Sequence, residues 1–216
     1  MKLTDGLFHK VFDEIAPEYP EIANEHMIVD IGAARLADTP ERFDMIVAPN
    51  LYGDILSDIA AQVAGSVALA PSANIGIECA MFEAVHGSAP DIAGLDVANP
   101  SGLLLAGAMM LVHVGQPEVA ARVQNAWRKT IEDGVHTPDI YVEGKSVQLV
   151  GTQAFADAVI ARLGLEPAHL PVIDTAPVAP VRVARAKPVV SRPPEKVLVG
   201  VDVFVDYKGP VADLAE

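Results

Sequence analysis

The sequence FDMIVAPNLYGDILSDIAAQV, residues 43–63, contains the signals of a strand, a turn and a helix in succession. Residues 43–48 are mostly apolar and lie between two prolines, which is typical of a buried strand. Residues 49–53 predict a tight turn, and residues 54–63 predict a helix that starts at a sheet edge. Open α/β folds place ligands at such an edge, so we expect functional residues here.

The rest of the chain repeats this alternation. A second short strand is expected at MIVDI, residues 27–31. Apolar residues at helical spacing predict further helices over residues 7–15, 103–113, 119–132 and 154–163. Asp5 is a candidate cap for the first helix. Helices that alternate with short apolar strands indicate an α/β domain.

Composition limits the classes of function. The net charge of −14 argues against a partner that is nucleic acid or an anionic membrane, whereas a small anionic substrate remains compatible with it. No uninterrupted apolar run is long enough for a transmembrane helix. The single cysteine, Cys79, excludes a disulfide framework within one chain and fits a reducing cytoplasm, so we expect a cytoplasmic protein.

Changes in amino-acid composition along the chain predict three regions. Residues 1–165 carry the α/β pattern, and residues 166–195 are rich in proline, which indicates an extended linker. Residues 196–216 contain one strong strand signal, over 197–207. A single strand is not stable alone, so we expect it to be the first strand of a small α+β C-terminal module.

Two aspartates stand out in residues 54–63. Asp54 and Asp58 are at positions i and i+4, so they share one face of the predicted helix and repel each other. A bridging cation would remove this repulsion, and carboxylate oxygens suit Mg²⁺ or Mn²⁺. Asp30, in another strand-like run, is a candidate third ligand. The alternative is an ordinary solvated acidic helix face.

A second constellation is EAVHGSAPDIAG, residues 83–94. Gly87 permits close backbone approach, Ser88 and backbone N–H groups can hold a phosphate or a ribose, and His86 can contact a purine. The alternative is a structural loop. The chain has no GxGxxG or P-loop motif, so a nucleotide site here is of another type.

Together, several segments resemble the isocitrate/isopropylmalate dehydrogenase family, over residues 1 to about 163. They are MKLTDGLF (1–8), NLYGDILSD (50–58), PSANIG (71–76), EAVHGSAPDIAG (83–94) and ANPSGLLLAGAMML (98–111). The resemblance implies part of that family's mixed sheet with flanking helices, and MKLTDG points to the isocitrate branch. Residues 188–207 resemble the start of a C-terminal extension of larger bacterial isocitrate dehydrogenases.

The resemblance also implies roles for individual residues. Asp54 and Asp58 would bind the metal, and Asp30 would complete the site of the partner subunit in a homodimer. The nucleotide would be bound by His86, Gly87, Ser88, Ala89, Asp91, Ile92 and Asn99. NADP-using members carry Lys-Tyr where this chain has Asp91-Ile92. An aspartate would repel the 2′-phosphate of NADP, so we expect NAD rather than NADP.

The activity that the resemblance implies is oxidative decarboxylation of isocitrate to 2-oxoglutarate with reduction of NAD. The family's catalytic lysine and tyrosine are expected upstream of Met1, so no catalytic residue is assigned here and the chain alone is expected to be inactive. Isopropylmalate, homoisocitrate or tartrate are alternative substrates. A non-catalytic regulatory subunit is a further alternative, against which the presence of all three aspartates speaks.

Overall fold

The computed structural model describes residues 4–174. Its six α-helices in these residues are α1 (Thr4–Ile15), α2 (Val29–Asp38), α3 (Asn50–Val63), α4 (Ser101–His113), α5 (Pro117–Glu132) and α6 (Thr152–Ile160). The strands are β1 (Pro71–Ile75), β2 (Ala80–Ala84), β3 (Val135–His136) and β4 (Gln148–Leu149). The predicted strand over 197–207 and most of the predicted linker lie outside the described residues.

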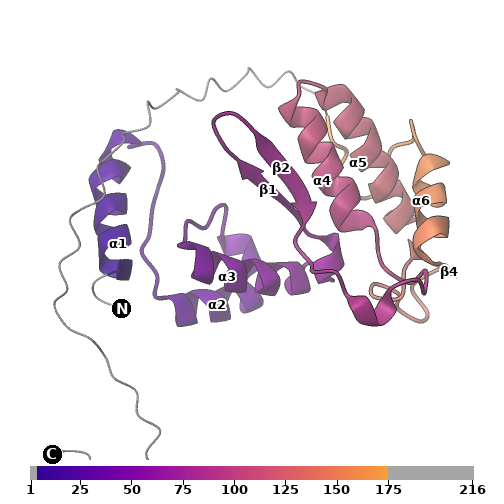
Figure 1. Ribbon diagram of the computed structural model, residues 1–216, viewed down its shortest axis with the longest axis horizontal. Coiled ribbons are helices and arrows are strands. Elements are labelled where there is room, and N and C mark those ends of the chain that lie inside the picture. The colour runs from indigo at the N-terminus through magenta and orange to yellow at the C-terminus, as the bar shows by residue number, and fades with distance from the viewer. Residues whose placement is uncertain (1–3, 175–216) are drawn as a thin grey trace, which may run out of the picture. The chain divides into compact units, whose positions relative to one another are not determined.

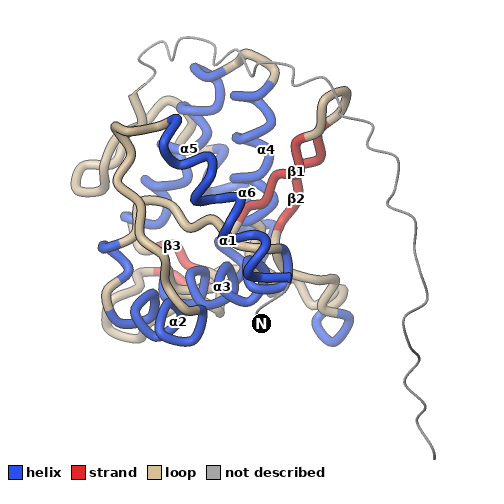
Figure 2. The backbone as a smooth tube through the Cα atoms, turned by 90° about the vertical axis from the view of Figure 1, so that its left-hand side faces the viewer, coloured by secondary structure: helices blue, strands red, loops and turns tan. Residues whose placement is uncertain are grey.

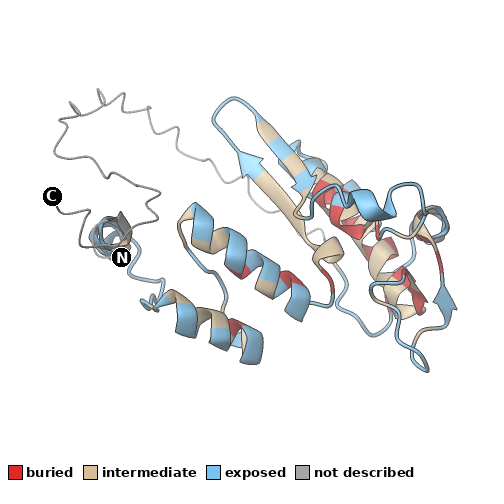
Figure 3. Ribbon diagram, turned by 60° about the horizontal axis from the view of Figure 1, so that its bottom comes forward, coloured by how far each residue is buried: buried red, intermediate tan, exposed pale blue. Residues whose placement is uncertain are grey.

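The hydrophobic core lies where α4, α5 and α6 pack together (Figures 1 and 3). Phe155 of α6 is fully buried and packs with Ala126 of α5 and with Val135 of β3. Helix α5 begins with Pro117, whose fixed φ and missing N–H suit a first helical position. Three of its five buried residues are alanines, and α4 packs against this helix.

A β-hairpin lies against α4. Strands β1 and β2 pair antiparallel, from Pro71 opposite Ala84 to Ile75 opposite Ala80 (Figure 2). A Cβ atom at Gly102 of α4 would lie 3.0 Å from the backbone oxygens of residues 68 and 70, so a side chain there would crowd the segment that leads into β1. The sequence patterns did not predict this hairpin, although it leads directly into the loop with His86.

The two predicted strands before residue 50 were wrong. Residues 29–31 form the first turn of α2, where Asp30 favours a helix because a carboxylate there complements the helix dipole. Residues 43–48 form no strand, and Met45 is 83% exposed. An apolar run becomes a strand only when a neighbouring strand pairs with it, and no described residue does so.

The predicted turn at residues 49–53 was also wrong, because Asn50 already begins α3. Pro49 precedes this helix as its N-cap, which suits proline since a helix start leaves backbone N–H groups without internal partners. The end of α3 at Val63 was predicted correctly, and the helices predicted over 103–113, 119–132 and 154–163 are confirmed with shifts of a few residues.

The α/β class is confirmed, but the described residues contain no single mixed sheet. Strands β3 and β4 pair parallel over two residues, apart from the β1–β2 hairpin. Within the described residues, no helix is long and apolar enough to cross a membrane.

Candidate functional site

Asp54 and Asp58 lie on the exposed side of α3. The opposite side of the helix carries buried Leu56, so the packing of Leu56 fixes which face the two carboxylates occupy. Ser57, between them, donates its hydroxyl to the Asp54 carbonyl oxygen over 2.9 Å and so does not engage either carboxylate. The prediction that both acids share one accessible helix face is therefore consistent with the structure.

Asp30 lies on α2, and this helix packs beside α3 (Figure 1). Its side chain is exposed, and its Oδ1 accepts the backbone N–H of Ile31 over 2.7 Å. Among residues 4–174, no three His, Cys, Asp or Glu side chains gather closely enough to hold a metal ion. The described chain thus presents Asp54 and Asp58 as a pair, and Asp30 as a separate carboxylate.

The donor set nevertheless fits a hard divalent cation. Two carboxylates on successive turns of a helix offer oxygen ligands, which Mg²⁺ and Mn²⁺ prefer, and leave other coordination positions to oxygens from elsewhere. Neither carboxylate is withdrawn from solvent. Asp54 and Asp58 could therefore bind a cation that a substrate or a further side chain completes.

The loop after β2 carries most of the predicted nucleotide-binding residues. It is tied to the hairpin by the N–H of Val85, which donates to the Ala70 carbonyl over 3.1 Å. His86 is exposed, and its Nδ1 lies 2.9 Å from the Gly87 carbonyl oxygen. Gly87, Ser88, Ala89, Asp91 and Ile92 are exposed as well. A dinucleotide could reach all of them from solvent.

Backbone geometry marks this loop as constrained. Ala89 has φ 43° and Asp96 has φ 54°, and these are the described non-glycine residues with positive φ. Such conformations cost about 1–3 kcal/mol each and persist where surrounding contacts impose them. Ala89 directly precedes the short 3₁₀-helix Pro90–Ile92, so its conformation sets the direction of Asp91.

Asn99 differs from the other predicted residues because it is buried, with 4% exposure. Its Oδ1 accepts the backbone N–H of Ser101 over 3.0 Å at the start of α4. Its Nδ2 donates to Oδ2 of Asp139 over 3.1 Å. Asn99 therefore positions the loop. The second hydrogen of its amide is not used in these bonds and could donate to a ligand.

Asp96 is a positioning residue that the sequence patterns did not reveal. Its Oδ1 accepts the N–H of Gln153 over 3.0 Å, and its carbonyl accepts the N–H of Thr152 over 3.1 Å. A carboxylate at a helix start satisfies free N–H groups and complements the helix dipole. Asp96 thus connects the loop after β2 to α6. The pair Gly151-Thr152 at a helix start is the weak signal that could have pointed to such a cap.

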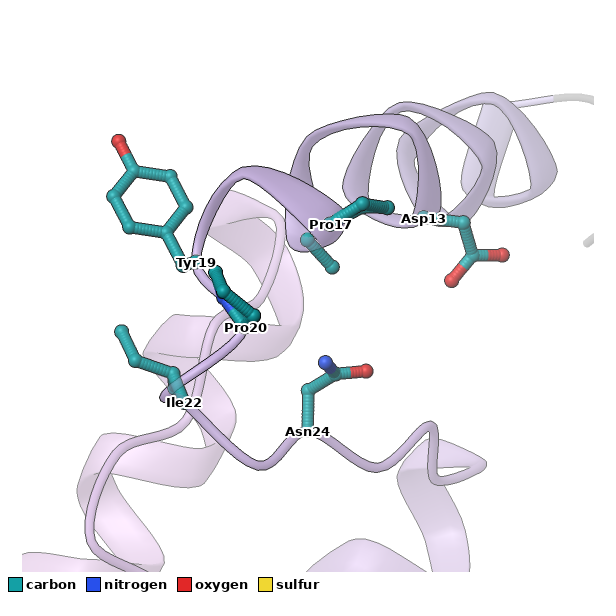
Figure 4. Close-up of a pocket in the computed structure, with 7 residues that line it drawn as sticks. Asp13, Pro17, Tyr19, Pro20, Ile22 and Asn24 are labelled. Carbon is teal, nitrogen blue, oxygen red and sulfur yellow. The ribbon is translucent and has the colours of Figure 1, made fainter.

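Two cavities accompany these elements. One, of about 350 Å³, lies where α1 ends, and the carboxylate of Asp13 and the amide of Asn24 are among its lining groups (Figure 4). It contains none of the predicted site residues. The other, of about 540 Å³, is lined by Ala64, Gly65, Leu69, Trp127, Arg128, Ile131, His136, Asp139, Ile140, Tyr141, Val142, Leu170 and Pro171.

Two aromatic side chains that line the second cavity are held by hydrogen bonds. Trp127 donates its indole N–H to the Ser101 hydroxyl over 2.8 Å. His136 places Nδ1 2.7 Å from the Ser146 hydroxyl and Nε2 3.1 Å from the Ile131 carbonyl. Both ring nitrogens of His136 therefore have protein partners, which favours a structural role over a nucleotide contact.

Known proteins resemble this chain over most of its length. The isocitrate/isopropylmalate dehydrogenase family model matches residues 1–159. The "Isocitrate dehydrogenase [NADP]" of Rickettsia felis is 59% identical over 206 residues, which are 95% of this chain and 43% of that protein. The "Isocitrate/homoisocitrate dehydrogenase" of Thermus thermophilus is 47% identical over 163 residues, or 76% of this chain and 47% of that protein.

A solved structure supports the same relation. The isocitrate dehydrogenase of Methylococcus capsulatus superimposes with a TM-score of 0.71 at 48% identity, over 75% of this chain and 47% of that chain. The chain thus spans less than half the length of these relatives. The match to the Rickettsia protein also extends beyond residue 159, where the family model ends.

Proposed function

This chain belongs to the isocitrate/isopropylmalate dehydrogenase family, and on that basis we propose that a protein containing it oxidises and decarboxylates isocitrate to 2-oxoglutarate. The observation that carries the proposal is the exposed Asp54–Asp58 pair on α3, beside a helix that presents Asp30. The names of the Rickettsia and Methylococcus relatives support isocitrate as the substrate.

Asp54 and Asp58 are proposed to hold Mg²⁺ or Mn²⁺. A bound divalent ion acts as a Lewis acid towards hydroxyl and carbonyl oxygens. The role of the chain itself is to fix two carboxylates on one rigid helix face, which places their charge without reorganisation during the reaction. Leu56, buried on the opposite face, keeps that orientation. We expect proton transfer to depend on lysine and tyrosine residues outside this chain.

The oxidant is proposed to be a nicotinamide dinucleotide bound at the exposed loop after β2. The accessible candidates are His86, Gly87, Ser88, Ala89, Asp91 and Ile92, and Asn99 is a further, buried candidate. The NAD preference expected from Asp91 has no support from the comparisons, because the Rickettsia relative is named as an NADP enzyme. The proposal therefore names the dinucleotide class, and Asp91 is the residue through which its preference can be tested.

We further propose a homodimer in which Asp30 completes the metal site of the second subunit. Asp30 lies in the exposed first turn of α2, and within the described residues it does not join a three-acid group with Asp54 and Asp58. A carboxylate that is exposed and adjacent but not convergent is suited to serve a second copy of the chain.

Homoisocitrate is the second candidate substrate, because the Thermus relative is named for both acids. A regulatory subunit without activity is disfavoured, since all three aspartates are retained. The test is a substrate panel with the complete protein, Mn²⁺ and each dinucleotide. Isocitrate should give the highest kcat/KM among isocitrate, homoisocitrate, isopropylmalate and tartrate. A higher value for another acid would replace the substrate, and no turnover of any would contradict the proposal.

A further inference from the structure

The segment after α6 is hydrogen-bonded to α5, although its prolines predicted an extended linker. Residues 168–173, called the strap here, are held along α5 by hydrogen bonds to their main-chain atoms. The side chains that hold them are Asn125, Arg128 and Glu132 of α5, called the clasp here. These three are spaced at i, i+3 and i+7, which places them on one face of the helix.

Glu132 holds the beginning of the strap. Its Oε2 accepts the backbone N–H of Ala168 over 2.7 Å, and its Oε1 accepts those of His169 and Leu170 over 2.5 Å and 3.0 Å. Three successive backbone N–H groups thus converge on one carboxylate. Hydrogen bonds to an ionised acceptor are about twice as strong as neutral ones. Lys129, 3.2 Å away, adds an ion pair that orients the carboxylate.

Asn125 holds the end of the strap in a two-way contact. The N–H of Ile173 donates to Oδ1 of Asn125 over 2.8 Å, and Nδ2 of Asn125 donates to the Ile173 carbonyl over 3.0 Å. Between the two ends, the Arg128 guanidinium donates to the carbonyl of Pro171. Asn125 itself is 5% exposed, so its amide is committed to this contact.

The clasp forms hydrogen bonds with the backbone of the strap and not with its side chains. The side chains of Ala168, His169 and Leu170 are exposed, while their N–H groups are used. An attachment of this kind tolerates changes of sequence in the strap, provided that the N–H groups remain. Loss of an N–H, as proline causes, should release it.

The strap also forms part of a cavity. Leu170 and Pro171 line the cavity of about 540 Å³ that Trp127 and Tyr141 line as well. Trp127 is the single tryptophan of the chain. Release of the strap therefore removes cover from a unique fluorophore, which makes the attachment measurable.

We propose that the clasp on α5 is a main-chain binding site whose ligand is the chain's own strap, and that the fastened strap closes one wall of the Trp127 cavity. The clasp holds Ile173, the last strap residue, on α5. Its basis is the set of hydrogen bonds to Glu132, Arg128 and Asn125, and it does not depend on the proposed catalytic function.

The first test is a matched pair of substitutions at one exposed position in the full chain. His169→Pro removes the N–H that Glu132 accepts, whereas His169→Ala keeps it. Hydrogen exchange of the peptide covering residues 168–173 is the readout. We expect exchange to be roughly tenfold faster or more in His169→Pro and unchanged in His169→Ala. Equal exchange in both variants would overturn the proposal.

The second test acts from the helix side. Glu132→Ala should raise both exchange in the strap and quenching of Trp127 fluorescence by acrylamide, while Glu118→Ala on the same helix should leave both unchanged. Protection of α6 amides reports whether the body of the protein remains folded. Faster strap exchange with unchanged α6 protection supports the clasp. Loss of protection in α6 and the strap together, in both Glu132→Ala and His169→Pro, would show that no separate clasp exists.

Discussion

The amide of Asn99 joins the carboxylate of Asp139 over 3.1 Å, from Nδ2 to Oδ2, while its oxygen accepts the N–H of Ser101. This buried residue connects the loop that precedes α4 with the loop that follows β3. Asp139 is fixed in turn by the hydroxyl of Thr137, which donates to its Oδ1 over 2.6 Å. The loop between β2 and α4 is therefore anchored at its end by the hydrogen-bonded side chains of Asn99, Asp139 and Thr137.

Asn99→Ala should destabilise the protein, because it removes the acceptor of the Ser101 backbone N–H and a charge-assisted hydrogen bond to Asp139. We expect the free energy of unfolding to fall by about 2–3 kcal/mol. Denaturant unfolding followed by circular dichroism measures this. A loss below about 0.5 kcal/mol would show that the Asn99 contacts do not hold the loop.

Gly151→Ala should also be destabilising. A Cβ atom at Gly151 would collide with the carbonyl and the carboxylate of Asp96, which cap α6. Overpacking of this kind costs about 1–3 kcal/mol. Gly107→Ala in α4 is the matched control, because nothing lies within 4 Å of the added Cβ. Thermal unfolding should show a lower Tm for Gly151→Ala alone, and equal Tm values in both variants would contradict the packing described.

Asp91→Lys should shift the dinucleotide preference towards NADP in the complete protein. The exposed carboxylate disfavours a 2′-phosphate, and a lysine would attract it. Two unit charges about 4 Å apart interact by about 1 kcal/mol or more, so kcat/KM for NADP relative to NAD should rise about tenfold. An unchanged ratio would show that Asp91 does not face the adenosine ribose.

The strap should loosen only in strong acid. The backbone N–H of Ala168, together with those of His169 and Leu170 and with Lys129, lowers the pKa of Glu132 to about 2 from an ordinary 4.5. A carboxylate with a lowered pKa contributes attachment that is complete above pH 4.5 and is lost as pH falls through about 2. Hydrogen bonds from Lys129 and Arg162 also lower the pKa of the adjacent Asp133, so the contacts of Asp133 are lost in acid as well.

Acrylamide quenching of Trp127 between pH 5 and pH 2 measures this release. The unaltered chain should show rising quenching towards pH 2, whereas Glu132→Gln should start high and change less. Because Asp133 is retained in that variant, its contribution cancels in the comparison. Parallel pH profiles in the two proteins would contradict the role of Glu132.

Much of the helical part of this fold could be predicted from sequence. Helices α4 to α6 carry both the apolar spacing and local start signals, and their packing partners lie nearby in the chain, so the pattern and the structure agree. The strand predictions at 27–31 and 43–48 were wrong because an apolar run does not specify its pairing partner. The β1–β2 hairpin was missed because β1 contains Pro71 and Asn74, which are residue types uncommon in strands.

The candidate site divides in the same way. The i, i+4 spacing of Asp54 and Asp58 is local and could be read directly, and the exposed loop with His86 carried a recognisable string. The cap by Asp96 and the contact of Asn99 with Asp139 join residues about 40 or more positions apart, so sequence spacing gives no sign of them. The clasp at Glu132 was missed for the same reason, because its ligand is main chain.

The most direct test is the metal dependence of isocitrate oxidation in the complete protein, with Asp54→Asn compared with Asp44→Asn. Asp54→Asn removes a charge from the proposed ligand pair. The resulting fall in kcat/KM should correspond to a loss of several kcal/mol of transition-state stabilisation, and a higher Mn²⁺ concentration should be needed for activity. Asp44 is exposed outside the site and its variant should behave as the unaltered protein. Unchanged turnover of Asp54→Asn at limiting Mn²⁺ would contradict the proposal.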